Sequence, residues 1–491
     1  MVMSDTTFRG NFIDGEFRPP AGDAFSSENP ASPGTLVLTA ASDASAVDTA
    51  VDAAAGALGA WRRLSQTERN EWLLRVRSKV AEHKPRLAEA IRLEMGKVQS
   101  EALIEAGSIV GKLDGLLRLF PHELPGAADG APGEQRHHPL GVVGIIGPFN
   151  FPVHLINTHV IPSLLTGNTV VVKPSEVTPL VGQRYAELFA DAGLPPGVFN
   201  LVHGTGDVGA ALAAHTGIRG LVFTGSYGTA RRIRQATFDQ PFKKVCLELG
   251  GKNPAVVLDD ADLDHAVREI LLGALLTTGQ RCTATSRVIA SPGIAARLRD
   301  RLIDAFSRIQ PGPPDDPATF MGPLANRASR DRFMSLLDTA GPNSKVLVES
   351  RALDGGYYVT PGLYELFGAS PIVTEELFGP HVAFEVADSE DDAIDRVTSN
   401  PFGLSASLFT ARRDRFETFY EVVPAGVLNH NRSTNGASGL LPFGGVGMSG
   451  NFHSSGAAAL KLGTYPVAVM AGDPKSPTPH TNLDIQLGEQ R

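Results

Sequence analysis

The sequence predicts an α/β protein of more than one domain, and three observations lead to this fold class. The chain has 491 residues, more than one ordinary domain contains. With 42% hydrophobic and 20% charged residues, its composition is that of a folded globular protein. From residue 141 onward, short apolar runs rich in β-branched residues alternate with segments of helical spacing, which is typical of βαβ units and a mostly parallel sheet.

The N-terminal part of the chain lacks this alternation. Residues near 42–118 are rich in Ala, Leu, Glu and Arg at roughly helical spacing, which predicts several amphipathic helices. Pro and Gly punctuate the stretch 119–140, and we interpret it as an excursion from the first domain.

Two series of strands follow, and their runs are continuously apolar, as expected for parallel strands buried on both faces. We place the domain junction between the two series, at Gly250–Gly251. The first series is predicted at Gly141–Ile146, Thr169–Val172, Val198–Val202, Gly220–Phe223 and Val245–Leu249. The second has strands at Asn253–Leu258, Arg287–Ala290, 345–349 and 380–386, with helices near 262–276, 294–309 and 326–340.

Bulk properties exclude several classes of protein. The two cysteines, Cys246 and Cys282, argue against a secreted disulfide scaffold and a structural zinc site. The net charge is -9 and no long Lys/Arg block occurs, so no nucleic-acid-binding surface is implied. The N-terminus lacks the apolar stretch of a signal peptide, and no run approaches the ~20 apolar residues that cross a bilayer. We expect a cytoplasmic protein with no metal, membrane or nucleic-acid partner.

Cys282 is the first candidate for chemistry, because it follows Gly279-Gln280-Arg281 near a predicted helix end. A thiol with a pKa of ~8.5 is only slightly ionised at neutral pH, so it needs dipoles or cations, which Arg281 and nearby backbone amides are placed to supply. A lone cysteine is more often a small buried hydrophobe, and we interpret Cys246, within an apolar strand, in that way.

A carboxylate and an amide are the next candidates. Glu248 lies in an apolar strand before two glycines, and burial makes such a carboxylate a candidate proton acceptor near neutrality. Asn150 follows a strand within GPFNFP, and its side-chain amide is suited to donate a hydrogen bond to a developing oxyanion. The common alternatives are a structural ion pair for Glu248 and a turn hydrogen bond for Asn150.

Further motifs fit a nucleotide. Lys173 and Glu176 follow a strand whose carboxyl end is expected to face a ligand crevice, and a carboxylate there repels a 2′-phosphate. Two glycine motifs compete for the phosphates. Gly204–Gly209 matches G-x-G-x-x-G but brings Asp207, whereas Phe223–Ser226 offers helix N-terminal amides and a hydroxyl. Their spacing does not decide between them.

Seven motifs, in order, resemble the aldehyde dehydrogenase superfamily across nearly the whole chain. They are PFNFP at 148–152, KPSE at 173–176, FTGS at 223–226, ELGGKNP at 248–254, GQRC at 279–282, EELFGP at 375–380 and PFGG at 442–445. The resemblance implies an aldehyde-dehydrogenase-like α/β fold with a Rossmann-type cofactor domain, an α/β catalytic domain and a small β oligomerisation element. These parts are expected at 1–118 with 141–249, at 250–448, and at 119–140 with 449–471, followed by an extended tail at 472–491.

The resemblance also implies roles for single residues. It implies that Cys282 is the nucleophile, Glu248 the general base and Asn150 the oxyanion donor beside the Cys282 N–H. Its implied NAD contacts are Lys173 and Glu176 at the adenine ribose, Gly225 and Ser226 at the pyrophosphate, Glu376 at the nicotinamide ribose, and Phe378 and Phe149 nearby. The implied reaction oxidises an aldehyde to an acid through a thiohemiacetal and a thioester. Glu176 favours NAD, and NADP stays open as an alternative.

Within the superfamily, the chain is most similar to the succinylglutamate-semialdehyde dehydrogenases of bacterial arginine catabolism. The stretches that carry this similarity are 133–141, 192–204, 278–283 and 441–451. N-succinylglutamate 5-semialdehyde is a dianion, so cationic residues should line its pocket, and Arg281, Arg287 and Arg432 are the candidates. His430 stands where relatives often have Trp, which leaves the exact aldehyde open.

Relatives form dimers or tetramers through the 119–140 segment and a strand near Thr464–Met470, so the resemblance implies at least a homodimer. Three alternative functions remain at this stage. They are an aldehyde dehydrogenase for another aldehyde or semialdehyde, a CoA-acylating relative, and a catalytically silent binding or structural protein. Glu248 argues against CoA acylation, and the set of Cys282, Glu248 and Asn150 argues against a silent protein.

Overall fold

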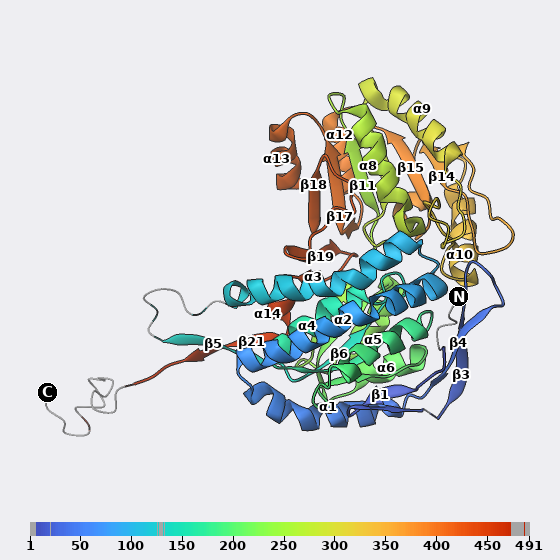
Figure 1. Cartoon of the computed structure of the whole chain (residues 1–491). Helices are drawn as coiled ribbons and strands as arrows, with labels where there is room; N and C mark the ends of the chain where they lie inside the picture. Colours follow the sequence, from blue (N-terminus) through green and yellow to red (C-terminus); the bar gives the residue numbers. More distant parts are fainter. Residues whose placement is uncertain are drawn as a thin grey trace.

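In the computed structural model, the chain forms two seven-stranded sheets flanked by helices, and a two-stranded arm projects from them (Figure 1). The structure describes residues 6–19, 21–124, 126, 131, 133–472 and 486. Apart from positions 472 and 486, the predicted tail at 472–491 lies outside the described residues.

The first sheet is built around the predicted parallel strands. Its order is β10-β9-β6-β7-β8-β1-β2, and the pairs from β10 to β8 are parallel. The strands are β10 (Lys244–Glu248), β9 (Ile218–Thr224), β6 (Val142–Ile146), β7 (Thr169–Lys173), β8 (Phe199–Leu201), β1 (Asn11–Ile13) and β2 (Glu16–Arg18). The prediction of a mostly parallel sheet is therefore confirmed, with an antiparallel N-terminal hairpin added at one edge.

Both faces of this sheet are covered, which is why its strands read as unbroken apolar runs. In β6, Val143 and Ile145 pack in one hydrophobic cluster, while Val142 and Ile146 pack in the other. The first cluster includes α2 (Gln66–Met95), α3 (Gln99–Glu123), α4 (His154–Leu165) and α5 (Pro179–Asp191). The second includes α1 (Ala46–Arg63), α6 (Gly206–Ala214) and α7 (Tyr227–Ala236).

The second sheet contains the strands that follow Gly250. Its order is β13-β14-β15-β12-β11-β17-β18, all parallel except β13 against β14. The strands are β13 (Ser344–Val348), β14 (Gly362–Leu366), β15 (His381–Val386), β12 (Thr285–Ala290), β11 (Asn253–Val257), β17 (Ser405–Phe409) and β18 (Val427–His430). The helices packed on it are α8 (Leu263–Leu275), α9 (Pro292–Arg308), α10 (Arg327–Leu337), α12 (Glu390–Thr398) and α13 (Arg413–Val422).

Some elements differ from the sequence-based expectation. Helix α3 runs to Glu123, so the predicted excursion at 119–140 begins later than expected. The helix continues because Leu119 and Phe120 are partly buried against the first hydrophobic cluster. Strands β14, β17 and β18 are additional. In β17, Ser405 and Ser407 are buried, so this strand lacks the continuous apolar run that marks the others.

A two-stranded arm extends from the molecule. Strand β5 (Glu134–Pro139) pairs antiparallel with β21 (Thr464–Val469), and Figure 1 shows this pair projecting away from both sheets. Its exposed apolar residues include Tyr465, and Met470 follows it. Two smaller sheets complete the fold: β16 (Phe402–Gly403) with β19 (Pro442–Gly447) and β20 (Phe452–Gly456), and β3 (Asp23–Glu28) with β4 (Leu36–Ser42).

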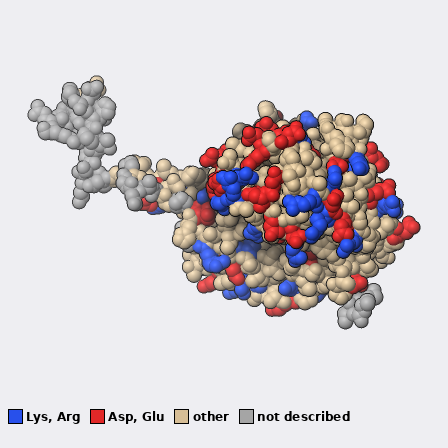
Figure 2. Space-filling model, turned by 90° about the horizontal axis from the view of Figure 1, so that it is seen from above, with Lys and Arg blue, Asp and Glu red and all other residues tan. Residues whose placement is uncertain are grey.

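The surface shows mixed charge. On the face seen in Figure 2, Lys and Arg side chains alternate with Asp and Glu instead of forming one basic patch. Among the described helices, none combines the length and apolar character that a bilayer-spanning segment needs. Within the same described ranges, His, Cys, Asp and Glu side chains do not gather into a group of three or more that could hold a metal ion.

Candidate active site

A cavity of about 600 Å³ lies between the two sheets. Ile146, Lys173, Thr224 and Glu248 line it, and each is the last residue of a strand in the first sheet. Cys282 and other residues that follow Gly250 close the opposite side. Ligand crevices of parallel α/β sheets occur at this carboxyl edge, and the volume is in the range of small-molecule sites.

The cavity brings together most residues that the sequence singled out. Ten of them line it: Cys282, Glu248, Asn150, Lys173, Glu176, Gly225, Ser226, Glu376, Phe378 and Phe149. Arg281, Arg287 and Arg432 are not among its lining residues. The thiol, the buried carboxylate and the amide, which are distant in the chain, therefore share one cavity.

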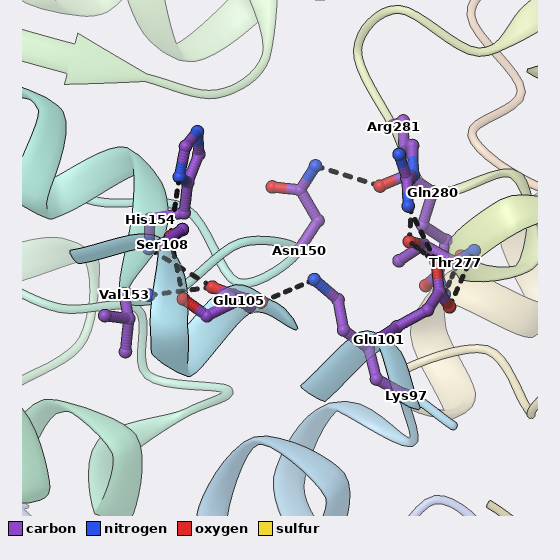
Figure 3. A network of polar contacts seen from close by, with 10 residues as sticks. All are labelled: Lys97, Glu101, Glu105, Ser108, Asn150, Val153, His154, Thr277, Gln280 and Arg281. Carbon is purple, nitrogen blue, oxygen red and sulfur yellow. Dashed lines mark hydrogen bonds and ion pairs between the residues drawn. The ribbon is translucent and has the colours of Figure 1, made fainter. Parts of the chain in front are cut away.

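A strained loop presents Cys282. Thr277 and Thr278 both have a φ of 56°, and Gly279 has a φ of 69°, so three consecutive residues lie in the left-handed region. This conformation is costly for a β-branched residue, and such strain persists only where surrounding contacts hold it. Glu101, on α3, supplies these contacts: its carboxylate accepts hydrogen bonds from Thr277 N at 3.1 Å and Thr277 Oγ1 at 3.0 Å (Figure 3).

Asn253 fixes the other side of the nucleophile. Its Nδ2 donates to the carbonyl oxygens of Cys282 at 2.8 Å and Ala284 at 2.9 Å, and its Oδ1 accepts from Ser405 N at 3.1 Å. The amide therefore joins the first residue of β11 to the loop of Cys282 and to β17. With its backbone held on both sides, Cys282 has a defined position at the cavity wall.

The thiol of Cys282 is held neutral at rest. Burial raises its pKa to about 12, and the carboxylates of Glu248 and Glu376 act in the same direction. The backbone amides of Thr283 and Cys282 lower this pKa, as expected from the sequence. Arg281 does not provide the expected activation, because its guanidinium donates to Glu101 at 2.7 Å and to Thr277 Oγ1 at 3.0 Å. That expectation from the sequence is therefore wrong.

Asn150 lies in the turn after β6, and its position is set by a single backbone contact. Its Nδ2 donates to the carbonyl oxygen of Gln280 at 2.9 Å, as Figure 3 shows. Gln280 is in turn anchored, because its Oε1 accepts from Ala325 N at 3.0 Å. A primary amide has two N–H donors, so the contact with Gln280 leaves one for a ligand beside Cys282.

Glu248 ends strand β10 and is buried, with 3% of its surface exposed. Its carbonyl oxygen accepts from Gly225 N at 3.0 Å, and the next residue, Leu249, donates to Ser449 O at 3.0 Å. The backbone at the end of β10 is thus fixed to two neighbouring loops. This fixes the carboxylate at the cavity, within electrostatic reach of Cys282.

Lys173 and Glu176 form an ion pair at another part of the cavity wall. Lys173 Nζ lies 3.2 Å from Glu176 Oε2 and donates to Pro174 O at 3.0 Å. Lys173 is buried, whereas Glu176 is half exposed. Burial lowers the pKa of Lys173, and the Glu176 carboxylate opposes this shift. The pair presents both a donor and an acceptor to a ligand.

Both glycine motifs contribute to the wall. Helix α7 begins after Ser226, whose side chain caps it by accepting from Thr229 N at 3.3 Å. Helix α6 begins at Gly206, and Gly206 and Gly209 also line the cavity. The Asp207 carboxylate is hydrogen-bonded within the protein: the hydroxyls of Ser42 and Thr205 donate to its Oδ1 at 3.0 Å and 2.6 Å.

Glu376 lies on the second side of the cavity and is held by a backbone contact. Its Oε1 accepts from Gly251 N at 3.1 Å, and burial raises the pKa of this carboxyl to about 7. A Cβ on Gly250 would lie 2.1 Å from the carboxylate, so only glycine leaves room for it. Phe378 follows with a φ of 57° and packs edge-on against Phe149, with ring centroids 5.9 Å apart.

The structure places the three predicted substrate arginines away from the cavity. Arg287 is 2% exposed and pairs with Glu385 at 2.8 Å, so its charge is compensated inside the second sheet. Arg432 is exposed on the loop after β18. His430 stacks on Phe416, with centroids 5.0 Å apart, and is not among the lining residues. An arginine in a strand or loop gives no sequence signal of the side on which it lies.

Sequence reasoning missed Glu101 and Asn253 as supports of the Cys282 loop. Glu101 lies on an amphipathic helix far from any motif, and nothing in its neighbourhood marks it. Asn253 lies within the ELGGKNP motif, so the motif itself was the available signal. Both act through hydrogen bonds to backbone atoms distant in the chain, which no local pattern reveals.

Comparisons with known proteins agree with this geometry. The model of the aldehyde dehydrogenase family matches residues 17–468. N-succinylglutamate 5-semialdehyde dehydrogenase of Chromobacterium violaceum is 37% identical over 469 residues, covering 94% of this chain and 96% of the relative. Its counterpart from Vibrio cholerae is 37% identical over 470 residues, covering 94% and 97%. Aldehyde dehydrogenase C of Pseudomonas syringae, solved with NAD+ and octanal, superposes with a TM-score of 0.90 at 30% identity, covering 95% of this chain and 97% of that chain.

Proposed function

The chain belongs to the aldehyde dehydrogenase family, and from this premise we propose that it oxidises N-succinylglutamate 5-semialdehyde to N-succinylglutamate with NAD. The observation that carries the proposal is the convergence of Cys282, Glu248 and Asn150 on one cavity. The substrate is proposed from the 37% identity to relatives that bear this substrate in their names.

The residues of the cavity fit NAD. The elongated wall offers Lys173 and Glu176 for ribose hydroxyls, and the α7 N-terminus with Ser226 for the pyrophosphate. Gly206, which lines the cavity, has nothing within 4 Å of a Cβ position, so the backbone there leaves room for a ligand. Glu176 repels a 2′-phosphate, which favours NAD over NADP.

We assign the chemical steps to this chain's own groups. Glu248 accepts the thiol proton of Cys282, and Sγ attacks the aldehyde carbon to form a thiohemiacetal. The free N–H of Asn150 and the Cys282 N–H stabilise the resulting oxyanion. Bound NAD supplies the hydride acceptor for the oxidation. Loss of the hydride leaves a thioester on Sγ, and the proton on Glu248 leaves to solvent. Glu248 then accepts a proton from the water that attacks the thioester; the C–S bond breaks, Sγ takes up this proton, and the acid is released.

We also propose an assembly and a location. The division at Gly250 assigns the first sheet to cofactor binding and the second to catalysis. The β5–β21 arm, with exposed apolar residues such as Tyr465, favours pairing with a second copy of the chain, as a homodimer or homotetramer. Two free cysteines and no disulfide fit a reducing, cytoplasmic compartment.

The direct test is NADH formation from N-succinylglutamate 5-semialdehyde compared with hexanal and succinic semialdehyde. The proposal expects the highest kcat/KM for the first, with NAD preferred over NADP and no requirement for CoA. Equal kcat/KM values for all three aldehydes would contradict the proposed substrate. A strict requirement for CoA would contradict the hydrolytic role of Glu248.

A further inference from the structure

Lys112, on helix α3, is a partly buried cation with no carboxylate partner among the described residues. Its Nζ donates to Thr158 Oγ1 at 2.5 Å, and no acidic side chain of the described residues forms an ion pair with it. By contrast, the other two cations that act on His154, Lys97 and Arg281, are compensated. Lys97 pairs with Glu105 at 2.6 Å, and Arg281 pairs with Glu101 at 2.7 Å. A charge that is partly withdrawn from water and has no counter-ion is costly, so we expect a partner for Lys112 that comes from outside the chain.

The groups around Lys112 come from two facing helices. On α3, Ser108 and Lys112 are one turn apart; on α4, His154 and Thr158 are one turn apart. Ser108 Oγ lies 3.0 Å from His154 Nδ1, and Lys112 Nζ donates to Thr158 Oγ1. Two successive turns of α3 therefore contact two successive turns of α4. These two contacts fix the ammonium at the interface between α3 and α4.

At this α3–α4 interface, His154 supplies a hydrogen-bond acceptor but no charge. The Ser108 hydroxyl donates to Glu105 O at 2.7 Å, so His154 Nδ1 must donate to it and Nε2 carries the lone pair. Burial lowers the pKa of His154 to about 3, and Lys112, Lys97 and Arg281 act in the same direction. Lys112 is therefore the one source of unbalanced charge among the described groups named here.

Two segments that flank Cys282 connect the α3–α4 interface to the nucleophile. On one side, Thr283 Oγ1 donates to Asn435 Oδ1 at 2.8 Å, and the same loop continues to Gly439, where an added Cβ would lie 3.2 Å from Lys112 Cε. On the other side, the Arg281 guanidinium lies 5.2 Å from the Phe151 ring centroid.

The second of these segments reaches α4 directly. The Phe151 ring lies 6.0 Å from the ring of His154, so the contacts run from Arg281 through Phe151 to the α3–α4 interface. Figure 3 shows His154 and Arg281 on either side of Asn150. Lys112 does not line the 600 Å³ cavity, so any ligand that it holds lies outside the part of the site assigned to the cofactor.

We propose that Lys112 is the carboxylate-binding residue of the substrate side of the active site, holding an acid group of the aldehyde through a charge-assisted hydrogen bond. This inference rests on the proposed function for the position of the nucleophile and replaces the three arginines as the source of substrate recognition. The substrate carboxylate would accept further hydrogen bonds from Nζ, whose one acceptor among the described residues is the Thr158 hydroxyl. The negative charge of the substrate also balances the positive charge of Lys112, which has no counter-ion like those of Lys97 and Arg281.

The test compares Lys112→Met and Lys112→Arg with Lys79→Met, which removes the same charge from an exposed ion pair with Glu82. Each variant is assayed with N-succinylglutamate 5-semialdehyde, succinic semialdehyde and the neutral aldehyde hexanal. Lys112→Met should raise KM for the anionic aldehydes by about 10- to 100-fold, the factor that one charged hydrogen bond contributes, and leave kcat/KM for hexanal within about threefold. Lys112→Arg should restore part of the loss, and Lys79→Met should change nothing.

A second readout does not depend on turnover. Succinate and N-succinylglutamate should slow alkylation of Cys282 by iodoacetamide in the wild-type protein and in Lys79→Met, and this protection should be lost in Lys112→Met. Equal losses for anionic and neutral aldehydes, or protection that survives in Lys112→Met, would overturn the proposal. If the wild type shows no preference for N-succinylglutamate 5-semialdehyde while Lys112→Met still loses anionic aldehydes selectively, the proposed substrate fails and the anion site stands.

Discussion

Glu101 is expected to control activity without touching the cavity. Its carboxylate accepts from Thr277 N, Thr277 Oγ1 and Arg281 Nη2, and all three donors lie within five residues before Cys282. The backbone at Thr277 is left-handed, with a φ of 56°. Replacing Glu101 with Ala removes the group that holds this conformation, so the loop relaxes and Cys282 moves.

The magnitude follows from these contacts. Each hydrogen bond to a charged group contributes about 1.5–3 kcal/mol, but three bonds to one carboxylate are not additive. The side chains of Glu101 and Arg281 are 11% and 20% exposed, so the pair is largely screened from water. Relaxation of two strained residues, at about 1–3 kcal/mol each, offsets part of the loss. We expect the free energy of unfolding to fall by about 2–4 kcal/mol. A displacement of the nucleophile by about 1 Å should lower kcat/KM by roughly 100-fold.

The assay measures kcat/KM and thermal unfolding for Glu101→Ala and Glu101→Gln. The Gln variant keeps one acceptor oxygen for Thr277 but loses the ion pair with Arg281, so an intermediate loss of about tenfold is expected. Glu82→Ala, which breaks the exposed ion pair with Lys79, is the matched control and should behave as wild type. A kcat/KM for Glu101→Ala within threefold of wild type would refute the argument that this carboxylate positions the loop.

Three further predictions concern the cavity. Cys282→Ala should abolish the single-turnover burst of NADH while Cys246→Ala, in the sheet core, keeps it; a burst in the former would exclude Cys282 as the nucleophile. Burial raises the pKa of Glu376 to about 7, so the carboxylate is present above that pH and protonated below it. KM for NAD should therefore rise as the pH falls from 8 to 6 in the wild type and stay flat in Glu376→Gln; parallel profiles would contradict a ribose contact. Gly250→Ala places a Cβ 2.1 Å from the Glu376 carboxylate and should raise KM for NAD about tenfold, whereas Gly228→Ala, which meets nothing within 4 Å, should not.

The parallel sheets were predictable because burial on both faces leaves a direct trace in the sequence. All predicted strands of the two series agree with the observed ones to within two residues at either end. Strand β17 shows the limit of this rule. Its Ser405 donates to Thr434 O at 2.7 Å, so a polar side chain is satisfied inside the core and interrupts the apolar run. The additional strands therefore depend on tertiary hydrogen bonds that no local pattern encodes.

The candidate site was predictable where a motif fixes the chemistry of a residue, and less so where the surroundings decide its role. The motifs identified Cys282, Glu248 and Asn150, which share the cavity. The motifs did not identify which cationic side chains face a substrate. The sequence alone does not show whether a basic residue forms an ion pair within the protein. Arg287 has Glu385 at 2.8 Å, whereas Lys112 has only a hydroxyl, and that difference exists only in three dimensions.

The protonation of Cys282 follows the same logic. The sequence places Arg281 next to the thiol and thereby favours a lowered pKa. The structure turns that guanidinium to Glu101 and puts two carboxylates within electrostatic reach of the sulfur, so burial and these charges raise the pKa to about 12. A neutral thiol resists oxidation and alkylation, since the thiolate is the reactive form. The resting chain therefore protects its nucleophile. Activation must accompany removal of the proton by a neighbouring base, which is the task that the position of Glu248 at the same cavity suits it to perform.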